Sequence, residues 1–429
     1  MDTIIEPRVL KGFRDFLPDD QIQRRDLIAR IEAIFRLYGF VPIDTPALEY
    51  AEILLGKSGG ETEKQIYRFI DHGNRDVALR FDLTVPFARF FAEHRAELPL
   101  PFKRYHIAKV WRGENTQRGR YREFTQCDFD IVGTDSPAAD FEILFMIRHV
   151  LQTVVSTPVT IHINHRGMFN RFLDRLSLRE KSTDILRLVD KRAKLGAEQI
   201  QSQMIEQVGA AHAEKIMQFI DLKGSFEEIV EGMIELSGGT CPESATLLRI
   251  HHFLSDAGAA DSYRLDPSIT RGLDYYTGLV YETFLNELPA IGSVCSGGRY
   301  DNLTSLYSPE HTTGVGASIG LDRLIAALEA LGCLKAQKGA VRLAIVCEDA
   351  EAAGSYQALA MRFRERGIPC EVFFDAIKVT KQYQEAEKKG IQFVLIPSGC
   401  DQTFTLRDLE TRQNTDKLRL SDIVDIVAR

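Results

Sequence analysis

The sequence predicts an α+β core with a mainly antiparallel sheet, followed by a smaller α/β domain with a largely parallel sheet. Up to about residue 165, apolar and polar residues alternate in strand-like runs that are not regularly separated by crossover helices. After about residue 340, short apolar runs alternate with helical patterns, which is typical of a parallel sheet. A chain of 429 residues is also too long for one ordinary core.

The elements follow from hydrophobic spacing. A helix is expected from about Pro18 to Gly39, because apolar residues recur there at helical spacing. Alternation predicts strands at 79–85 and 159–164. Residues 166–255 are rich in Leu, Ile, Glu, Lys and Gln, and they predict a helical insertion.

Strand-like sequence returns near residue 271 and runs into a helix that begins near Leu321. The stretch Ala336–Gly339 has the composition of a linker. We therefore expect four segments, a first core part, an insertion, a second core part and a C-terminal domain, at 1–165, 166–255, 256–334 and 335–429.

Composition excludes several classes of protein. The sequence has no run of 18 apolar residues and no secretory signal at its N-terminus, so we expect a cytoplasmic protein without a membrane span. Seven scattered cysteines without a C-x-x-C pair argue against a disulfide framework or a structural zinc site, and they favour a reducing compartment. The net charge is −8, so a nucleic-acid surface would have to be local.

Two apparent motifs do not meet the requirements of their chemistry. Gly56-Lys57-Ser58 resembles the end of a phosphate-binding P-loop, but Ala51 stands where the first glycine is needed. The run 316–320 matches G-x-S-x-G formally. A hydrolase triad needs a later histidine, and the last one, His311, precedes Ser318.

The segment 102–132 carries a stronger signal. Between Lys103 and Glu123 there are seven basic and two acidic residues, which favours a polyanion site over a merely solvated loop. On the strand that follows, Gln126, Asp128 and Asp130 share one face by their alternation. Carboxylates aligned with an amide on a sheet face can recognise a small polar ligand.

Three further segments combine polar residues with glycine. Residues 271–278 place an arginine, an acid and two phenols beside glycines, and 295–301 form a second polar turn. Residues 314–324 are a small-residue strand leading into a helix that carries Arg323 in its first turn. Small residues leave room for a flat ligand, and the arginine can stack on a ring or bind phosphate.

The order of these elements resembles that of class II aminoacyl-tRNA synthetases, and it narrows to the histidyl-tRNA synthetase family. Motif 1 would be the helix ending at Gly39 with Val41–Pro46, motif 2 would be Arg104–Asp128, and motif 3 would be Gly314–Arg323. The run Arg-Gly-Leu-Asp-Tyr-Tyr within 271–278 resembles the signature of the histidyl branch. A prolyl, threonyl or glycyl enzyme, the other class II alternatives, would lack this run.

The resemblance implies a histidine–tRNA ligase. Such an enzyme activates histidine with ATP and Mg²⁺ to histidyl-adenylate, and then transfers histidine to the 3′ end of tRNA(His). It also implies a homodimer built through motif 1, an insertion that clasps the acceptor arm, and an anticodon-binding domain at 335–429. That domain has 15 basic and 14 acidic residues, so its tRNA surface would be a patch.

The resemblance also assigns residues, while ligands for a metal stay unassigned. Arg271 and Arg112 would be catalytic, acting at the α-phosphate. The histidine site would comprise Asp82, Thr84, Arg112, Gln126, Asp130, Arg271, Tyr275 and Tyr276. The ATP site would comprise Arg112, Glu114, Arg120 and Arg323.

One alternative function comes from a different class of protein. A non-catalytic relative serves as the regulatory subunit of ATP phosphoribosyltransferase and keeps the histidine-binding core. Such chains typically lack the C-terminal domain and the ATP-binding arginines. This sequence retains Arg112, Arg271, Arg323 and the C-terminal segment, which favours the ligase.

Overall fold

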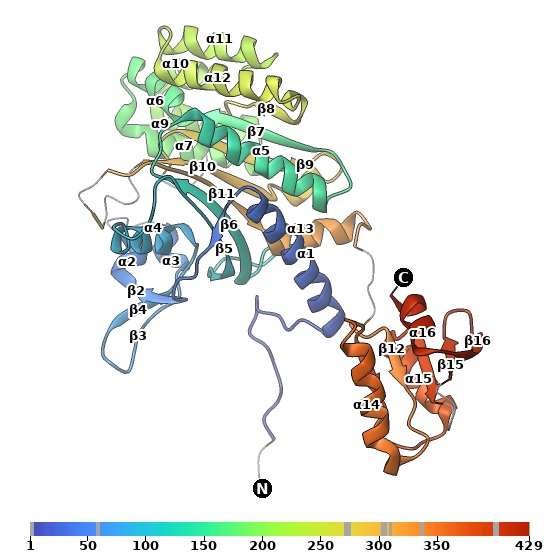
Figure 1. Ribbon diagram of the computed structural model, residues 1–429. Coiled ribbons are helices and arrows are strands. Elements are labelled where there is room, and N and C mark those ends of the chain that lie inside the picture. The colour runs from blue at the N-terminus through green and yellow to red at the C-terminus, as the bar shows by residue number, and fades with distance from the viewer. Residues whose placement is uncertain are drawn as a thin grey trace. The chain divides into compact units, whose positions relative to one another are not determined.

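The computed structural model describes residues 4–56, 61–269, 276–301, 307–308, 311–334, 339–397 and 403–428 (Figure 1). The chain divides into two compact units. Unit 1 comprises Met1–Asp15 and Leu27–Leu334, and unit 2 comprises Phe16–Asp26 and Lys335–Arg429.

Unit 1 is built on an eight-stranded sheet with the strand order β1-β5-β6-β11-β10-β9-β7-β8. The pairs from β5 through β7 are antiparallel, and only the outer pairs β1–β5 and β7–β8 are parallel. The predicted α+β class with a mainly antiparallel sheet is confirmed. The strands are β1 Val41–Pro42, β5 Phe102–Trp111, β6 Glu123–Val132, β7 Val159–His165, β8 Tyr263–Leu265, β9 Leu279–Leu285, β10 Cys295–Tyr300 and β11 Gly314–Gly320.

One face of this sheet is apolar and packs against the part of helix α1 (Pro18–Leu37) from Leu27 onward, and against α5 (Pro137–Val154) and α13 (Leu321–Ala330) (Figure 1). On β6, Cys127, Phe129 and Ile131 belong to this face. The ring of Phe129 lies 4.8 Å from that of Phe35 in α1, measured between ring centroids. Burial of this face supplies the main hydrophobic core of unit 1.

The opposite face of β6 is polar, and a smaller layer covers its end. This layer consists of a three-stranded sheet, in the order β2-β4-β3, with three short helices. Phe87 and Phe91 of the last helix pack against Phe102 and Val132 of the large sheet. The elements are β2 Leu48–Tyr50, α2 Ala51–Leu55, α3 Glu61–Gln65, β3 Arg68–Ile70, β4 Asp76–Leu79 and α4 Thr84–Glu93.

The prediction of a strand at 79–85 is wrong. The strand β4 ends at Leu79, and helix α4 begins at Thr84. The alternation of Leu79, Phe81, Leu83 and Val85 is real, but Phe81 and Leu83 are buried in the turn between the two elements. Alternation over so few residues does not distinguish a strand from a buried turn.

Along the chain, a group of helices follows β7 and precedes β8, in the segment where the sequence predicts a helical insertion (Figure 1). Their buried apolar residues are continuous with the core beneath the large sheet, and among them the rings of Phe172 and Phe219 stack at 4.6 Å. Ser225 and Glu228 form a capping box at the start of α11. The helices are α6 Arg166–Arg175, α7 Ser182–Asp190, α8 Arg192–Leu195, α9 Ala197–Val208, α10 Ala210–Ile220, α11 Phe226–Ser237 and α12 Pro242–Asp256.

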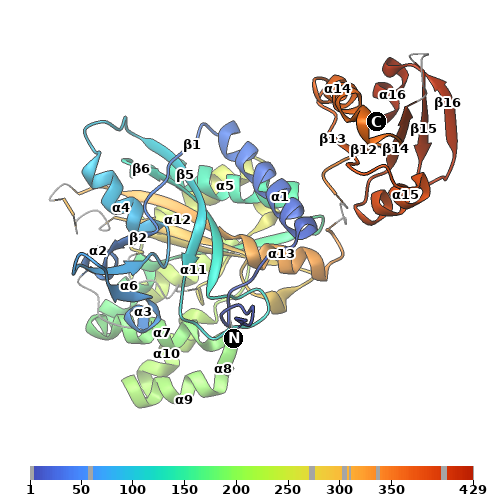
Figure 2. The ribbon, with the colours of Figure 1, turned by 90° about the horizontal axis from the view of Figure 1, so that it is seen from below.

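Unit 2 contains a five-stranded sheet in the order β13-β12-β14-β15-β16 (Figure 2). The first three strands are parallel, as expected, whereas β15 and β16 add an antiparallel edge that the sequence analysis does not predict. The elements are β12 Leu343–Ile345, α14 Ala353–Arg364, β13 Cys370–Val372, α15 Val379–Lys388, β14 Phe393–Pro397, β15 Phe404–Asp408, β16 Asn414–Leu418 and α16 Leu420–Val427. Within the described ranges, no helix has the length and apolar character needed to cross a bilayer.

Strand β11 is built from small residues because neighbouring groups approach it closely. A β-carbon at Gly316 would lie 1.9 Å from Oδ1 of Asp130 and 2.8 Å from the carbonyl oxygen of Phe129. Contacts this short force the neighbours to move. At Gly320, by contrast, the nearest atom would be 3.9 Å away.

We therefore predict that Gly316→Ala destabilises unit 1 by about 1–3 kcal/mol, the usual cost of overpacking a core. Gly320→Ala is the matched control on the same strand and should have a much smaller effect. Thermal denaturation of the two purified variants measures the difference. Equal melting temperatures for the two variants would show that the contact at Gly316 is not constraining.

Candidate active site

The polar face of the large sheet brings three strands together. Across β5 and β6, Arg104 lies opposite Asp130 and His106 lies opposite Asp128. Across β6 and β11, Asp130 lies opposite Gly316 and Asp128 opposite Ser318. Because directly opposed residues point to the same side of a sheet, these side chains share one face. The alternation of Gln126, Asp128 and Asp130 seen in the sequence therefore corresponds to a real polar surface.

Asp130 is held by two partners. Its Oδ2 lies 2.6 Å from Nη2 of Arg104, and its Oδ1 accepts a 2.6 Å hydrogen bond from the hydroxyl of Tyr300. The Arg104 guanidinium is fully buried and lies 4.0 Å from the centroid of the Phe87 ring. Burial raises the pKa of Asp130, while Arg104 and the Tyr300 hydroxyl favour its ionised form.

Two further buried carboxyl groups lie close to Asp130. Burial raises the pKa of Asp128 to about 7; the charge of Arg104 opposes this rise, and the charges of Asp130 and Asp82 add to it. Burial likewise raises the pKa of Asp82 to about 6, against the hydrogen bond donated by the Val85 N–H and the charge of Arg112. This pocket therefore contains more acidic groups than buried cations, which suits a cationic ligand.

Two polar atoms in the pocket indicate a missing partner. Oδ2 of Asp82 and Oε1 of Gln126 are buried and accept no hydrogen bond within the described part of the chain. The amide nitrogen of Gln126 is fixed, because it donates a 2.6 Å hydrogen bond to the hydroxyl of Ser318. Buried polar atoms in native proteins are almost always hydrogen-bonded, so these two acceptors point to a ligand or water with N–H or O–H groups.

A second cluster next to this pocket is cationic. Arg112 and Arg120 flank Glu114, with nitrogen–oxygen distances of 3.7 and 3.6 Å. Arg323 donates a 2.6 Å hydrogen bond to the carbonyl of Ser293. Burial lowers the pKa of Arg323 to about 10, and the positive charges of Arg120 and Arg112 act in the same direction. Three arginines with one glutamate form a site for an anion.

Arg112 connects the two clusters. Its Nε donates a 2.8 Å hydrogen bond to the carbonyl of Phe81, the residue before Asp82. Its charge acts both on Asp82 and on Arg323. A ligand with a cationic end and an anionic end could therefore bind here with Arg112 between the two.

The structure brings together most of the residues predicted from the sequence. Asp82, Gln126 and Asp130 line the acidic pocket, and Thr84 begins α4 just after Asp82. Arg112, Glu114, Arg120 and Arg323 form the cationic cluster described above. Tyr276 is buried beside Gly298, where a β-carbon would lie 2.7 Å from its ring. Arg271 and Tyr275 lie outside the described residues.

Two residues of the site, Arg104 and Tyr300, received no individual role in the sequence analysis. Asp128 was placed on the ligand-facing side of its strand with Gln126 and Asp130 by their alternation, although it was not assigned to the histidine site. Arg104 and Tyr300 carried no comparable signal, because their contacts with Asp130 depend on strand register and on a contact 170 residues apart in the chain.

Comparison with known proteins agrees with this geometry. The model of the histidyl-tRNA synthetase family matches residues 12–324, which is well over half of the chain. The chain belongs to the histidyl-tRNA synthetase family. A second model, that of an anticodon binding domain, matches residues 340–429.

The sequence aligns with those of curated relatives over almost its full length. The histidine–tRNA ligase of Treponema denticola is 51% identical over 99% of this chain and 96% of its own. That of Rhodopirellula baltica is 44% identical over 96% of each chain. The crystal structure of histidyl-tRNA synthetase from Nostoc sp. PCC 7120 matches with a TM-score of 0.88 and 30% identity, covering 99% of this chain and 100% of that one.

These comparisons confirm the predicted class II synthetase-like fold and the prediction of a histidine–tRNA ligase, an aminoacyl-tRNA ligase. A structure titled as an ATP phosphoribosyltransferase regulatory subunit/histidyl-tRNA synthetase, from Bacillus halodurans, shares the fold at a TM-score of 0.76 but is only 21% identical. The presence of the anticodon binding domain favours the ligase over the regulatory alternative.

The pKa of Asp128 leads to a prediction about stability. A carboxyl pKa raised from 3.8 to about 7 means that the folded state holds a proton that the unfolded state has lost between these values. Stability should therefore fall as pH rises through this window. Asp128→Asn removes this penalty, so its melting temperature should exceed that of the wild type at about pH 8 and lose this advantage at about pH 5.

Thermal denaturation at both pH values, with the exposed Asp135→Asn as the control, measures this effect. A stability difference between Asp128→Asn and the wild type that does not change with pH would contradict the assigned ionisation.

Proposed function

We propose that the polar face of unit 1 binds histidine and ATP, forms histidyl-adenylate and then transfers histidine to the 3′ end of tRNA(His). The observation that carries this proposal is the acidic pocket beside a cluster of three arginines, with Arg112 acting on both. An amino acid with a cationic end fits the first, and a polyphosphate fits the second.

The acidic pocket would bind histidine. Asp82, Thr84 and Gln126 would receive the α-amino group, and two acceptors of this set have no partner within the described residues. Asp130 and Tyr276 would face the imidazole, with Tyr275 assigned beside them from the sequence alone. A site built to hydrogen-bond a substrate N–H rejects analogues that lack it far better than an apolar pocket does.

The arginine cluster would bind ATP. Arg112 would contact the α-phosphate and the histidine carboxylate, while Glu114 and Arg120 would lie near the nucleotide. Arg323 would lie against the adenine and the γ-phosphate. Arg271, which we assign from the sequence alone, would also act at the α-phosphate.

Mg²⁺ would enter with the nucleotide. Among the described residues, no three His, Cys, Asp or Glu side chains are placed so that together they could hold a metal ion. This fits an ion held mainly by the phosphate oxygens and water, as is usual for Mg²⁺ at nucleotide sites. When bound, it would neutralise charge on the β- and γ-phosphates.

The arginines account for the first chemical step. A carboxylate oxygen of histidine forms a bond to the α-phosphorus, and the bond from that phosphorus to the pyrophosphate oxygen breaks. Two anions approach one another in this step, so preorganised cations lower the barrier. In the second step the terminal ribose hydroxyl of tRNA attacks the carbonyl carbon and AMP leaves.

The remaining segments would bind tRNA. We assign the helical segment 166–255 to the acceptor arm and the segment 335–429 to the anticodon, with the core formed by 1–165 and 256–334. The match of an anticodon binding domain to residues 340–429 supports the second assignment. A reaction that charges tRNA for translation would take place in the cytoplasm.

ATP–pyrophosphate exchange tests the proposed function. We expect exchange with histidine alone among the twenty amino acids. Arg112→Ala should lower this exchange by about 10²–10³-fold, since it removes a preorganised donor at developing charge. Arg118→Ala, a change at an exposed arginine of the same loop, should leave the rate nearly unchanged. A folded wild-type protein that exchanges with no amino acid would rule out the proposal.

A homodimer is the proposed assembly. Strand β1 lies at the edge of the large sheet, and apolar residues of motif 1 and of the segments next to it in the sequence are exposed. The exposed fraction of the residue is 77% for Leu37, 47% for Val41 and 50% for Tyr50. An exposed sheet edge flanked by apolar side chains is a typical site for pairing with a second copy.

We expect the wild type to sediment at twice the mass of one chain, and Leu37→Glu to shift the equilibrium toward the monomer. Burying one uncompensated carboxylate in an apolar interface is costly. Leu248→Glu, at an exposed leucine of α12, is the control and should stay dimeric. A wild type that sediments as a monomer at all concentrations would rule out this assembly.

A further inference from the structure

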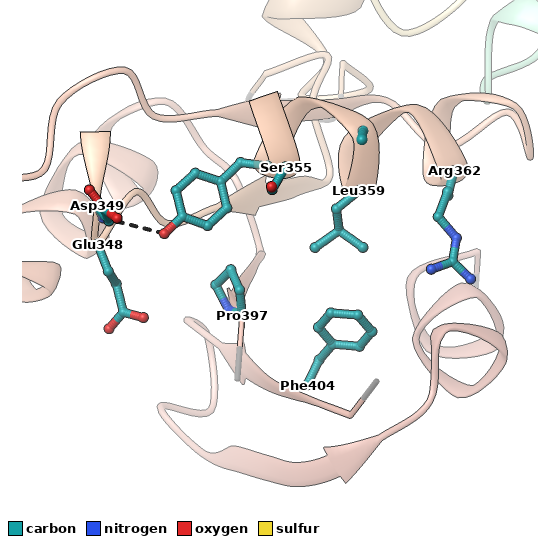
Figure 3. Close-up of a pocket in the computed structure, with 9 residues that line it drawn as sticks. Glu348, Asp349, Ser355, Leu359, Arg362, Pro397 and Phe404 are labelled. Carbon is teal, nitrogen blue, oxygen red and sulfur yellow. Dashed lines mark hydrogen bonds between the residues drawn. The ribbon is translucent and has the colours of Figure 1, made fainter. Parts of the chain in front are cut away.

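Unit 2 contains a cavity with a volume of about 680 Å³, lined by Tyr356, Leu359 and Phe404 among other residues (Figure 3). It falls within the segment that matches an anticodon binding domain, so it belongs with the tRNA binding already proposed. Unit 1 contains a feature that the proposed function leaves unexplained. This feature is the segment 11–15 near the N-terminus, which we call the N-terminal strap.

The backbone of the N-terminal strap lies against the loop between β5 and β6. The carbonyl oxygen of Gly12 accepts a 2.9 Å hydrogen bond from the N–H of Arg122, the last residue before β6. The carbonyl of Arg122 in turn accepts a 2.9 Å hydrogen bond from the N–H of Arg112. A β-carbon at Gly12 would lie 2.7 Å from Cγ of Arg122, and the φ angle of Gly12 is +89°. The strap therefore approaches the loop so closely that only glycine fits here without strain.

The side chain of Arg14 connects this loop to helix α13. Its guanidinium lies over the ring of Tyr121, 3.3 Å from the ring centroid, and it forms an ion pair with Asp322. Asp322 is the second residue of α13, and its side chain is 2% exposed, against 33% for Arg14. Arg14 is therefore a partly exposed cation that compensates a buried carboxylate.

The carboxylate of Asp322 also holds the start of β6 beside the helix. Its Oδ2 accepts a 2.7 Å hydrogen bond from the N–H of Thr125. At the next position along β6, the pairing with β11 ends at Gln126 and Gly320. The residue that follows Asp322 in the helix is Arg323, which we assign to ATP. One carboxylate therefore ties the beginning of β6 to the helix turn that carries Arg323.

The loop between β5 and β6 carries three of the residues that we assign to ATP, Arg112, Glu114 and Arg120. The same loop touches α13 directly, because a β-carbon at Gly119 would lie 3.4 Å from Cα of Arg323. The loop thus contacts both the strap and α13, and Arg14 links these two contacts. Placement matters here, since a shift of about 1 Å in a substrate-binding group can cost about 10²-fold in rate.

The histidine pocket is held by different contacts. Asp130 is fixed by Arg104 of β5 and by Tyr300 of β10. Gln126 is fixed by its hydrogen bond to Ser318 of β11. These three contacts involve neither the strap nor the loop between β5 and β6. Loss of a strap contact should therefore act on the ATP site and leave histidine binding unchanged.

We propose that Arg14 is a positioning residue for the ATP site. By compensating the buried charge of Asp322 and stacking on Tyr121, it holds the loop between β5 and β6 against α13. The arginines of the loop and of the helix then converge on the polyphosphate. The inference rests on the proposed function, because that function assigns ATP to the arginine cluster.

Calorimetric titration of the full-length protein with ATP and, separately, with histidine tests the proposal. We expect Arg14→Ala to weaken ATP binding by about tenfold, the usual scale for losing a hydrogen bond to a charged group, and to leave histidine binding unchanged. Arg14→Lys keeps the charge but loses the flat stacking surface, so its affinity for ATP should be intermediate. Arg8→Ala, at an exposed residue of the same N-terminal segment, is the matched control and should behave as the wild type.

Two further variants distinguish positioning from a general loss of packing. Tyr121→Leu should weaken ATP binding in the wild type but add little in the Arg14→Ala background, because the two side chains form one contact. Gly12→Ala displaces the strap backbone without changing the Arg14 side chain, and it should reproduce the defect specific to ATP. A purely structural role for Arg14 would instead lower the melting temperature and weaken both ligands in parallel.

Two outcomes would overturn the proposal. One is a folded Arg14→Ala variant that binds ATP like the wild type, and the other is an equal loss of affinity for ATP and for histidine. Histidine-dependent pyrophosphate exchange, measured on the same preparations, separates these results from failure of the proposed function. Exchange by the wild type together with normal ATP binding by Arg14→Ala removes only the role of Arg14. ATP binding that depends on Arg14, in a wild type that does not exchange, removes only the proposed reaction.

Discussion

The buried ion pair between Arg104 and Asp130 is the constraint around which the polar face of unit 1 is built. Removing two charges from water costs several kcal/mol for each ion, and close geometry with additional partners must offset that cost. Here the charged groups lie 2.6 Å apart, the Tyr300 hydroxyl donates to the same carboxylate, and Phe87 covers the guanidinium. The Nε and Nη1 of Arg104 make no hydrogen bond within the described residues, so the compensation falls mainly on the carboxylate side. A slip of one residue between β5 and β6 would turn one of the two charges toward the apolar helices and leave the other buried without its partner. The pair therefore also fixes the register of the sheet.

Local patterning predicted those parts of the structure that depend on neighbouring residues. The alternation of Gln126, Asp128 and Asp130 identified one face of β6, and helical spacing identified α1 and α13. The signature residues indicated the family. By contrast, the partners of Asp130 come from β5 and β10, and only tertiary structure sets that contact. The antiparallel edge was not predicted either. The residues of β16 are mostly exposed and show no apolar alternation, whereas β15 is too short for the alternation of Phe404 and Leu406 to identify it.

The segment at 79–85 shows a second limit of sequence reasoning. Its apolar residues alternate because Phe81 and Leu83 are buried in a turn, and that turn delivers Asp82 to the site. A strand and a well-buried turn demand similar apolar residues over so short a span. The incorrect strand prediction therefore concerns the segment in which the chain leaves regular secondary structure and positions the carboxylate of Asp82. Functional positions often break local rules in this way.

The position of Arg112 has a consequence for how two ligands influence each other. Its charge is shared between the acidic pocket and the arginine cluster, so occupation of either one alters the electrostatic free energy of the other. Such coupling is thermodynamically reciprocal. If bound nucleotide changes the affinity for the amino acid by a given factor, bound amino acid changes the affinity for the nucleotide by the same factor. With the proposed assignment, one guanidinium in the loop between β5 and β6 would make the two sites energetically dependent, without any need for a moving domain.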